Sequence, residues 1–316
     1  MVFALLSPPA EATASAVNPV VEPARTAEPQ FPGHRPGRAY LGMSCDDCAS
    51  RERQVGQGVG LKRWFEKWGD WSGVAAAIKE DRRKHRRPWI SIEGPQGGTP
   101  AGWLAVGQGA YDADLRGLAK VLKAHDERPV FLSFGHEVSN NLPDDQGRLW
   151  AKGFKRFHDV LDEKGALDKV ALAPIVASWL FDAANPQDPA AWLRPGVLRR
   201  TSFMGVDLYQ SDTGRGFAQR LPPVDTWLAQ HGYPDMGIGL GEIGATDYFG
   251  NVSGPTWLNR SLRWAAHHTD AVVAVSYFNS TANSDPGVYW PLDESADKLS
   301  VYRKWLDRPA FISRVP

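Results

Sequence analysis

Short hydrophobic runs alternate with longer amphipathic segments along the chain from residue 38 onward. Several of these runs are continuously apolar instead of alternating between apolar and polar positions. This pattern is typical of parallel strands that are buried on both faces of a sheet. The runs predict strands at 39–44, 58–65, 88–93, 129–134, 169–176, 202–209, 236–243 and 271–278.

The segments between the predicted strands carry apolar residues at helical spacing. The segment 113–125 places its leucines on one face, and 148–165 repeats this pattern and ends at a glycine, as helices often do. Asp70 or Ser72 could cap another such helix at its first turn. Further helices are predicted at 74–85, 224–232 and 255–268.

Strands that alternate with helices in this way predict an α/β fold of the (β/α)8 (TIM) barrel type, whose usual length is about 250 residues. We expect one catalytic domain at 38–316. An open, doubly wound sheet is the alternative. No glycine-rich dinucleotide-binding motif follows a predicted strand, which disfavours that alternative.

Residues 1–37 are rich in Ala and Pro and show no periodicity, which predicts a disordered leader or linker. A tail of this composition often follows a removed export signal, so we expect an extracellular or cell-surface protein. No stretch approaches the roughly 18 consecutive apolar residues of a membrane span.

The charges balance, with 36 basic and 36 acidic residues. A neutral chain gives no reason to expect nucleic acid as a partner. The 13 tryptophans are more informative, because flat aromatic faces suit sugar rings as well as protein cores. We therefore expect a polysaccharide or oligosaccharide as the substrate. We also expect the protein to be a monomer.

The two cysteines, Cys45 and Cys48, stand in the string CDDC. Two thiols alone cannot hold a structural zinc, and the intervening acidic residues would raise the thiol pKa instead of activating a redox motif. The sequence favours a small loop disulfide formed in an oxidising compartment. A pair of inert thiols is the alternative.

Polar residues follow many of the predicted strands, and the C-terminal ends of barrel strands are where such enzymes place their chemistry. Two glutamates stand out, because Glu137 follows the fourth strand and Glu242 lies at the seventh, on the opposite side of the mouth. The strand ends also carry Asp46, Asp47, Arg63, Trp64, Glu93, His136, Ser178, Trp179, Asp207, Tyr209 and Asn279.

Two carboxylates that face each other about 5–5.5 Å apart are what retaining glycoside hydrolysis requires. The apolar residues before Glu137 predict a raised pKa, which suits an acid. Tyr209 could donate a hydrogen bond that keeps Glu242 ionised as a nucleophile. The glycines that flank Glu242 would let a sugar approach closely.

The His136-Glu137 pair, GEIG at 241–244 and GVDLYQ at 205–210 resemble glycoside hydrolase family 26, within the clan of retaining barrel glycosidases. That family contains β-mannanases together with β-xylanases and mixed-linkage β-glucanases. The resemblance implies that Glu137 is the acid/base and Glu242 the nucleophile, with support from His136 and Tyr209. The chain departs from the family at Ser133, where an arginine is expected, and in the residues after Glu137.

Together these features predict a secreted, endo-acting retaining glycosidase for β-mannan or a related β-glycan, which needs no metal or cofactor. Each supporting residue also has a structural alternative; Glu93, for example, could simply pair with Arg63. The alternative functions are cleavage of another glycan, such as one of the bacterial envelope, and a catalytically silent glycan-binding barrel. The residues expected to bind substrate are His136, Tyr209, Trp179, Trp290, Asp207, Asn279 and Glu93.

Overall fold

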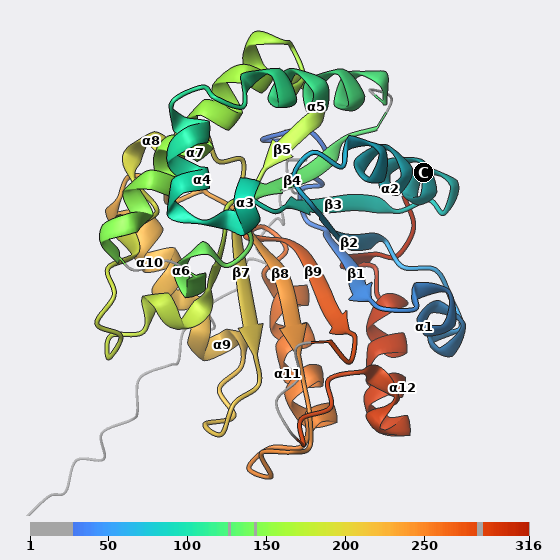
Figure 1. Cartoon of the computed structure of the whole chain (residues 1–316). Helices are drawn as coiled ribbons and strands as arrows, with labels where there is room; N and C mark the ends of the chain where they lie inside the picture. The colour runs from blue at the N-terminus through green and yellow to red at the C-terminus, as the bar shows by residue number, and fades with distance from the viewer. Residues whose placement is uncertain (1–27, 126–127, 142–143, 283–286, 316) are drawn as a thin grey trace, which may run out of the picture.

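The computed structural model describes residues 28–125, 128–141, 144–282 and 287–315. It confirms the predicted (β/α)8 barrel, in which a ring of parallel strands is surrounded by helices (Figure 1). The strands within the described residues are β1 (Ala39–Cys45), β2 (Leu61–Glu66), β3 (Arg87–Ile92), β4 (Val130–Phe134), β5 (Val170–Leu172), β6 (Ile175–Ala177), β7 (Met204–Tyr209), β8 (Ile238–Gly244), β9 (Val272–Asn279) and β10 (Phe311–Ile312).

The sheet closes on itself through a fifth barrel strand that is split in two. The strand order is β5-β4-β3-β2-β1-β9-β8-β7-β6, and only Ala173 and Pro174 separate β5 from β6. Ala173 N–H still donates to the carbonyl of Leu132 at 2.9 Å, and Gly205 N–H donates to Pro174 at 2.8 Å. Proline has no N–H to contribute, which explains why the ladder breaks at this point. In barrel terms, β7, β8 and β9 are therefore the sixth, seventh and eighth strands.

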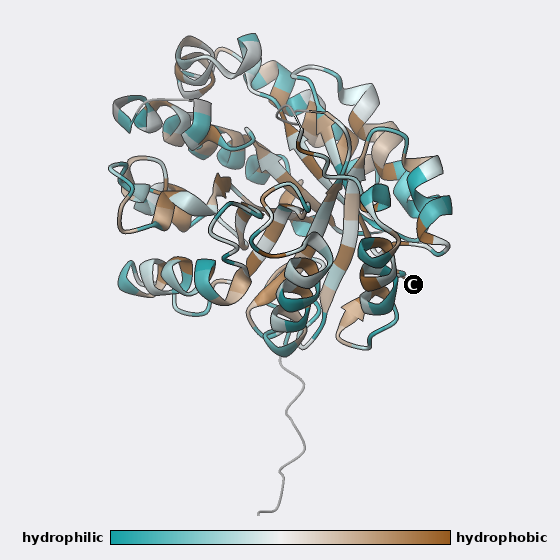
Figure 2. Ribbon diagram, turned by 90° about the horizontal axis from the view of Figure 1, so that it is seen from below, coloured by the Kyte–Doolittle hydropathy of each residue, from teal (hydrophilic) through white to brown (hydrophobic). Residues whose placement is uncertain are grey.

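Helices cover the outside of the barrel (Figures 1 and 2). The predicted amphipathic segments are confirmed as α2, α5, α7, α10 and α11, with shifts of a few residues at their ends. The helices are α1 (Cys48–Val55), α2 (Trp71–Arg83), α3 (Pro95–Gly98), α4 (Pro100–Gly107), α5 (Asp112–Ala124), α6 (Val138–Asn141), α7 (Asp144–Glu163), α8 (Pro195–Leu198), α9 (Phe217–Arg220), α10 (Pro222–Gln230), α11 (Gly254–His267) and α12 (Ala296–Leu306).

The local chemistry explains where these helices begin and which face they bury. Asp70 caps α2, as predicted, because its side chain accepts a hydrogen bond from Gly73 N–H at 2.8 Å. Leu115, Leu118 and Leu122 of α5 lie on the buried face that packs on the barrel. After the fifth strand, where a regular barrel carries a long helix, this chain has short 3-10 turns and the four-residue α8.

Aromatic side chains fill the N-terminal end of the barrel. Phe203 lies with its ring centroid 5.2 Å from that of Trp89 and 4.9 Å from that of Phe131. Phe31, from the segment assigned to the leader, stacks on Phe203 at 5.3 Å, and the nearby carbonyl of Gly33 accepts a hydrogen bond from Tyr40. The packed chain therefore starts before residue 38. Residues 1–27 lie outside the described part. No described helix is long and apolar enough to cross a membrane.

Candidate functional site

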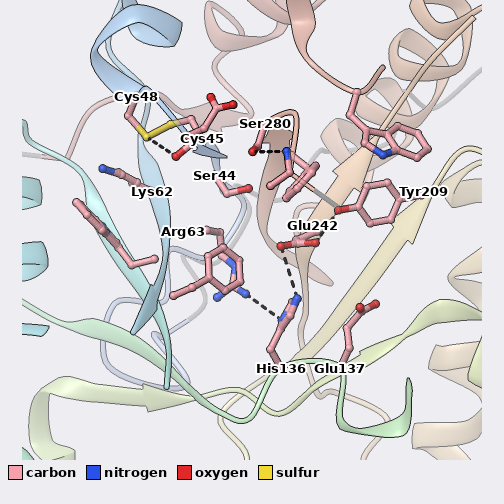
Figure 3. Close-up of a pocket in the computed structure, with 16 residues that line it drawn as sticks. Ser44, Cys45, Cys48, Lys62, Arg63, His136, Glu137, Tyr209, Glu242 and Ser280 are labelled. Carbon is pink, nitrogen blue, oxygen red and sulfur yellow. Dashed lines mark hydrogen bonds and ion pairs between the residues drawn. A yellow bond between two sulfur atoms is a disulfide. The ribbon is translucent and has the colours of Figure 1, made fainter. Parts of the chain in front are cut away.

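A cavity of about 750 Å³ lies at the C-terminal ends of the barrel strands. Its walls come from β1, β2, β7, β8 and β9 and from the turn that follows β4. The two glutamates singled out by the sequence, Glu137 and Glu242, both line this cavity (Figure 3). The barrel thus brings together two carboxylates that are 105 residues apart in the chain (242 − 137).

Glu242 lies almost buried on β8 and is held by polar neighbours on both sides. The Tyr209 hydroxyl donates a hydrogen bond to Oε2 at 2.6 Å, and Nε2 of His136 lies 3.6 Å from Oε1. Burial is the largest single influence and favours the neutral acid. His136, Arg63 and Tyr209 together outweigh it and lower the pKa of Glu242. Glu242 is therefore suited to remain an ionised carboxylate.

His136 connects the two sides of the cavity, and its hydrogen bonds define its tautomer. Nδ1 lies 3.4 Å from Nη2 of Arg63, and an arginine can only donate, so Nδ1 carries the lone pair. The proton then resides on Nε2, which lies 3.5 Å from Oδ2 of Asp207 and 3.6 Å from Oε1 of Glu242. His136 thus presents a donor to both carboxylates.

Arg63 rises from β2 into the centre of the barrel, where it is 2% exposed. Its guanidinium donates to the carbonyl of Gly241 at 3.2 Å and to the Ser91 hydroxyl at 3.0 Å. Ser133 lies beside Ser91 in the β3–β4 register and accepts from Trp89 at 2.9 Å. Serines at these two positions leave room for the guanidinium. The positive charge that contacts His136 thus comes from β2, and position 133 holds an uncharged serine.

Glu137 sits in the turn after β4, in a backbone conformation that glutamate rarely adopts. Its φ is +44°, and it follows Gly135 at φ +75°. A non-glycine residue in the left-handed region is strained by about 1–2 kcal/mol. The strained turn lifts the carboxylate beside His136 and turns it toward the side of the cavity that holds Glu242 (Figure 3).

The surroundings of Glu137 shift its pKa in the opposite direction to the shift of the Glu242 pKa. Burial of the Glu137 carboxyl is the largest influence and raises its pKa. The negative charge of Glu242 adds to this effect, while His136 and Asn140 oppose it in part. One cavity therefore holds two carboxyl groups whose pKa values are shifted in opposite directions by their surroundings.

Asp207 lies beside Glu242 in the register of the neighbouring strand β7, and it is 3% exposed. Burial and the charge of Glu242 raise its pKa well above the usual value. A Cβ at Gly241 would lie 2.6 Å from Oδ1 of Asp207, and one at Gly244 would lie 2.5 Å from the ring of Tyr209. These two glycines make room for protein side chains. The interpretation that they make room for a sugar is therefore wrong.

His136, Asp207 and Glu242 also form the group in the described residues whose potential ligand atoms could approach one ion, since all lie within 4.8 Å of one another. A metal would need the lone pair of Nε2, which carries the proton when Nδ1 accepts from Arg63. A buried guanidinium in contact with His136 would also repel a cation. With Arg63 beside it, this group of residues fits a cluster of interacting charges better than a metal centre.

The remaining predicted residues divide between the cavity and its surroundings. Trp290 lines the cavity, but it is only 9% exposed and packs on Tyr209 at 4.9 Å between ring centroids. Trp179 is 37% exposed and lies outside the cavity lining. Asn279 is fully buried, and its side chain accepts from Leu292 N–H at 2.9 Å. The Asn279 side chain therefore has a structural role and does not contact a substrate.

From the sequence, Glu93 was predicted either to bind the substrate or to form an ion pair with Arg63. Arg63 instead makes its hydrogen bonds to Gly241, Ser91 and His136, and Glu93 lies exposed at a second, smaller cavity. The ion-pair alternative is wrong.

Phe65, near the end of β2, lines the cavity although the sequence did not mark it as a candidate. It is 48% exposed although it projects on the same side of β2 as the buried Arg63. The signal was present in the sequence, because side chains alternate along a strand and Phe65 stands two positions after Arg63. The predicted strand 58–65 ended on this residue, so nothing marked its ring as exposed.

The Cys45–Cys48 pair forms the predicted disulfide, which is confirmed, and it lines the cavity wall. Between the two cysteines, Asp46 accepts hydrogen bonds from the backbone N–H and hydroxyl of Thr281, each at 3.1 Å. Burial opposes the charge of Asp46, but these hydrogen bonds and Arg51 lower its pKa to about 2. The disulfide loop thus ties β1 to the segment after β9 on this side of the mouth.

No protein-family model matches the sequence, and no curated protein matches it significantly. Solved structures do match. A Cellulomonas fimi endo-β-1,4-mannanase, described as a family 26 glycoside hydrolase, aligns with 88% of this chain and 72% of its own, at 12% identity and a TM-score of 0.62. A Bacillus subtilis mannanase aligns over 88% and 93%, at 14% identity and 0.56. A fungal β-1,4-galactanase aligns over 84% and 99%, at 13% identity and 0.60. At these identities the likeness establishes a shared fold.

Proposed function

We propose that the protein is a retaining glycoside hydrolase that cleaves a β-linked polysaccharide or oligosaccharide, as a divergent relative of family 26. One observation carries the proposal. Two carboxyl groups line the same cavity, and their surroundings shift the two pKa values in opposite directions. This is the acid/nucleophile pairing that retaining hydrolysis uses. The mannanases and the galactanase that share the fold support the class of reaction.

In the first step, ionised Glu242 attacks the anomeric carbon while Glu137 donates its proton to the departing glycosidic oxygen. The bond between that carbon and the oxygen breaks, and Glu242 becomes covalently linked to the sugar. The Tyr209 hydroxyl and Nε2 of His136 hold the Glu242 carboxylate in position before the attack.

In the second step, Glu137 has become a carboxylate and removes a proton from a water molecule, which attacks the same carbon. The ester to Glu242 breaks, and the sugar leaves with its original configuration. When Glu242 is esterified, its charge no longer raises the pKa of Glu137, so this carboxyl becomes easier to ionise when a base is needed.

The disulfide and a polymeric substrate are both consistent with a secreted enzyme. A disulfide persists in oxidising compartments, and a polysaccharide that cannot enter a cell must be cleaved outside it. We propose β-mannan or a related β-glycan as the substrate class, with cleavage inside the chain.

The proposal is tested by incubating the purified protein with mannans, xylans, glucans, galactans and bacterial-envelope glycans. We expect reducing ends to be released from at least one β-glycan, and proton NMR to show that the first product formed has the β configuration. An α product would contradict the retaining mechanism. Binding to a glycan without release of reducing ends would identify a catalytically silent barrel.

Replacing Tyr209 by phenylalanine tests how the nucleophile is kept ionised. The hydrogen bond at 2.6 Å helps to lower the pKa of Glu242, so its loss raises that pKa. Activity needs the ionised form, so the acid limb of the kcat/KM profile moves to higher pH. The basic limb of the profile reports the ionisation of Glu137, so we expect it at the same pH as in the wild type.

We also expect kcat/KM to fall by about 10- to 100-fold at neutral pH, the value of a hydrogen bond to a charged group. Tyr302→Phe is the matched control, since this hydroxyl is also buried and donates to the carbonyl of Gly42 at 2.7 Å, outside the cavity lining. If both variants keep the wild-type pH profile, Tyr209 does not tune the nucleophile.

A further inference from the structure

A second cavity of about 350 Å³ adjoins the main one at the ends of β2, β3 and β4. Phe65 and His136 line both cavities, so these side chains lie at the boundary between the two spaces. The smaller cavity has the size of a small-ligand site, for which about 300 Å³ is the lower end. None of the residues assigned to the chemistry lies in it except His136.

Phe65 is fixed between the two cavities, although nearly half of its surface is exposed. The ring of His136 meets it edge to face, with centroids 5.1 Å apart, and the Arg63 guanidinium lies 4.9 Å from its centroid. These contacts hold the ring in one orientation. Because Phe65 lines both cavities, a ligand bound there would cover its exposed apolar surface, which stabilises the bound state.

Glycines shape the other side of the second cavity. Gly94 carries no Cβ where one would lie 2.3 Å from the ring of Trp103, so this indole packs directly against the backbone. A Cβ at Gly97 would meet nothing closer than Oε1 of Glu93, at 3.9 Å. The wall therefore combines an aromatic ring, bare backbone and a carboxylate. Sugar rings bind to such walls through their apolar faces and their hydroxyl groups.

We propose that the second cavity is a sugar-binding subsite and that Phe65 is the aromatic platform over which the glycan chain passes from one cavity to the other. Glu93 accepts hydrogen bonds from hydroxyl groups of the sugar in this subsite. The catalytic part of this inference rests on the proposed function, whereas the binding part does not. The enzyme then selects chains long enough to span both cavities over single sugars.

Binding is measured first, by affinity electrophoresis with each polysaccharide of the panel, because this readout does not need hydrolysis. We expect Phe65→Ala to weaken binding about tenfold, as expected for the loss of one aromatic contact. Phe65→Leu keeps an apolar contact with His136 but lacks the flat face, and we expect a similar loss. Tyr248→Ala is the matched control, since Tyr248 is 56% exposed and lines neither cavity, and it should bind as the wild type does.

Kinetic measurements then distinguish two roles of Phe65: a platform that binds the glycan, and a support that holds His136 in position. On oligosaccharides of increasing length, Phe65→Ala should raise KM by about tenfold for long chains while kcat changes little. The loss should be smaller for an aryl glycoside of a single sugar. Equal losses on long and short substrates would overturn the platform role, because Phe65 would then act through His136.

Wild-type binding by both Phe65 variants would also overturn the inference. If the wild type hydrolyses nothing and Phe65→Ala still loses glycan binding, the subsite holds and the proposed hydrolase function fails.

Discussion

Replacing Glu242 by alanine is expected to lower kcat/KM by about 10⁴-fold or more, the scale on which removal of a catalytic nucleophile acts. This substitution removes the carboxylate that forms the covalent link to the sugar in the proposed first step. The loss can be measured with an aryl glycoside of the sugar identified by the glycan panel. Glu163→Ala is the matched control, because Glu163 lies exposed at the end of α7, and it should keep full activity.

Azide provides a sharper test of the same variant. The alanine leaves a space where the carboxylate lay, and an azide ion in that space can attack the anomeric carbon from the same side. We expect added azide to restore part of the turnover and to give the α-glycosyl azide, whose configuration is inverted relative to the β substrate. Thermal unfolding shows whether the variant is folded. Activity that remains near the wild-type level would remove Glu242 from the nucleophile role.

The barrel itself was predictable because its signal is local. Continuous apolar runs reflect strands buried on both faces, and this depends on each run alone. The split of the fifth strand at Ala173 and Pro174 was not predicted, since the flanking residues are as apolar as those of an unbroken strand. The short α8 was not predicted either, because four residues are too few to show an amphipathic helical pattern.

The candidate site was partly predictable, because a strand end fixes where a side chain starts but not where it ends. Glu137, Glu242 and Tyr209 reach the cavity directly from their strand ends. Arg63 acts across the barrel, on a carbonyl 178 residues away, and only the three-dimensional packing of small side chains around it reveals this. Asn279 also follows the strand-end rule but turns to bind its own loop.

Glu137→Gln is expected to lower kcat/KM on natural glycans by about 10²- to 10⁴-fold, the contribution of a general acid. The variant keeps the size of the side chain and the backbone at φ +44°, so its strain and its packing stay nearly the same. The leaving group of a natural glycan is an alkoxide, which departs slowly unless the acid donates a proton to it. A dinitrophenolate leaves without one, so the first step with a dinitrophenyl glycoside should lose much less. Equal losses on the two substrates would contradict the role of acid.

The pH dependence and azide complete this test. The pKa of Glu137 is raised by burial and by Glu242, so in the wild type the protonated acid is lost, and kcat/KM falls, on the basic side of the profile. In Glu137→Gln this basic limb should disappear. In Glu137→Ala, azide can enter the space that the Glu137 side chain occupied. There it attacks the sugar already linked to Glu242, so the product should be the β-glycosyl azide. The two alanine variants therefore give azides of opposite configuration. The same configuration from both would mean that the acid and the nucleophile have not been correctly assigned.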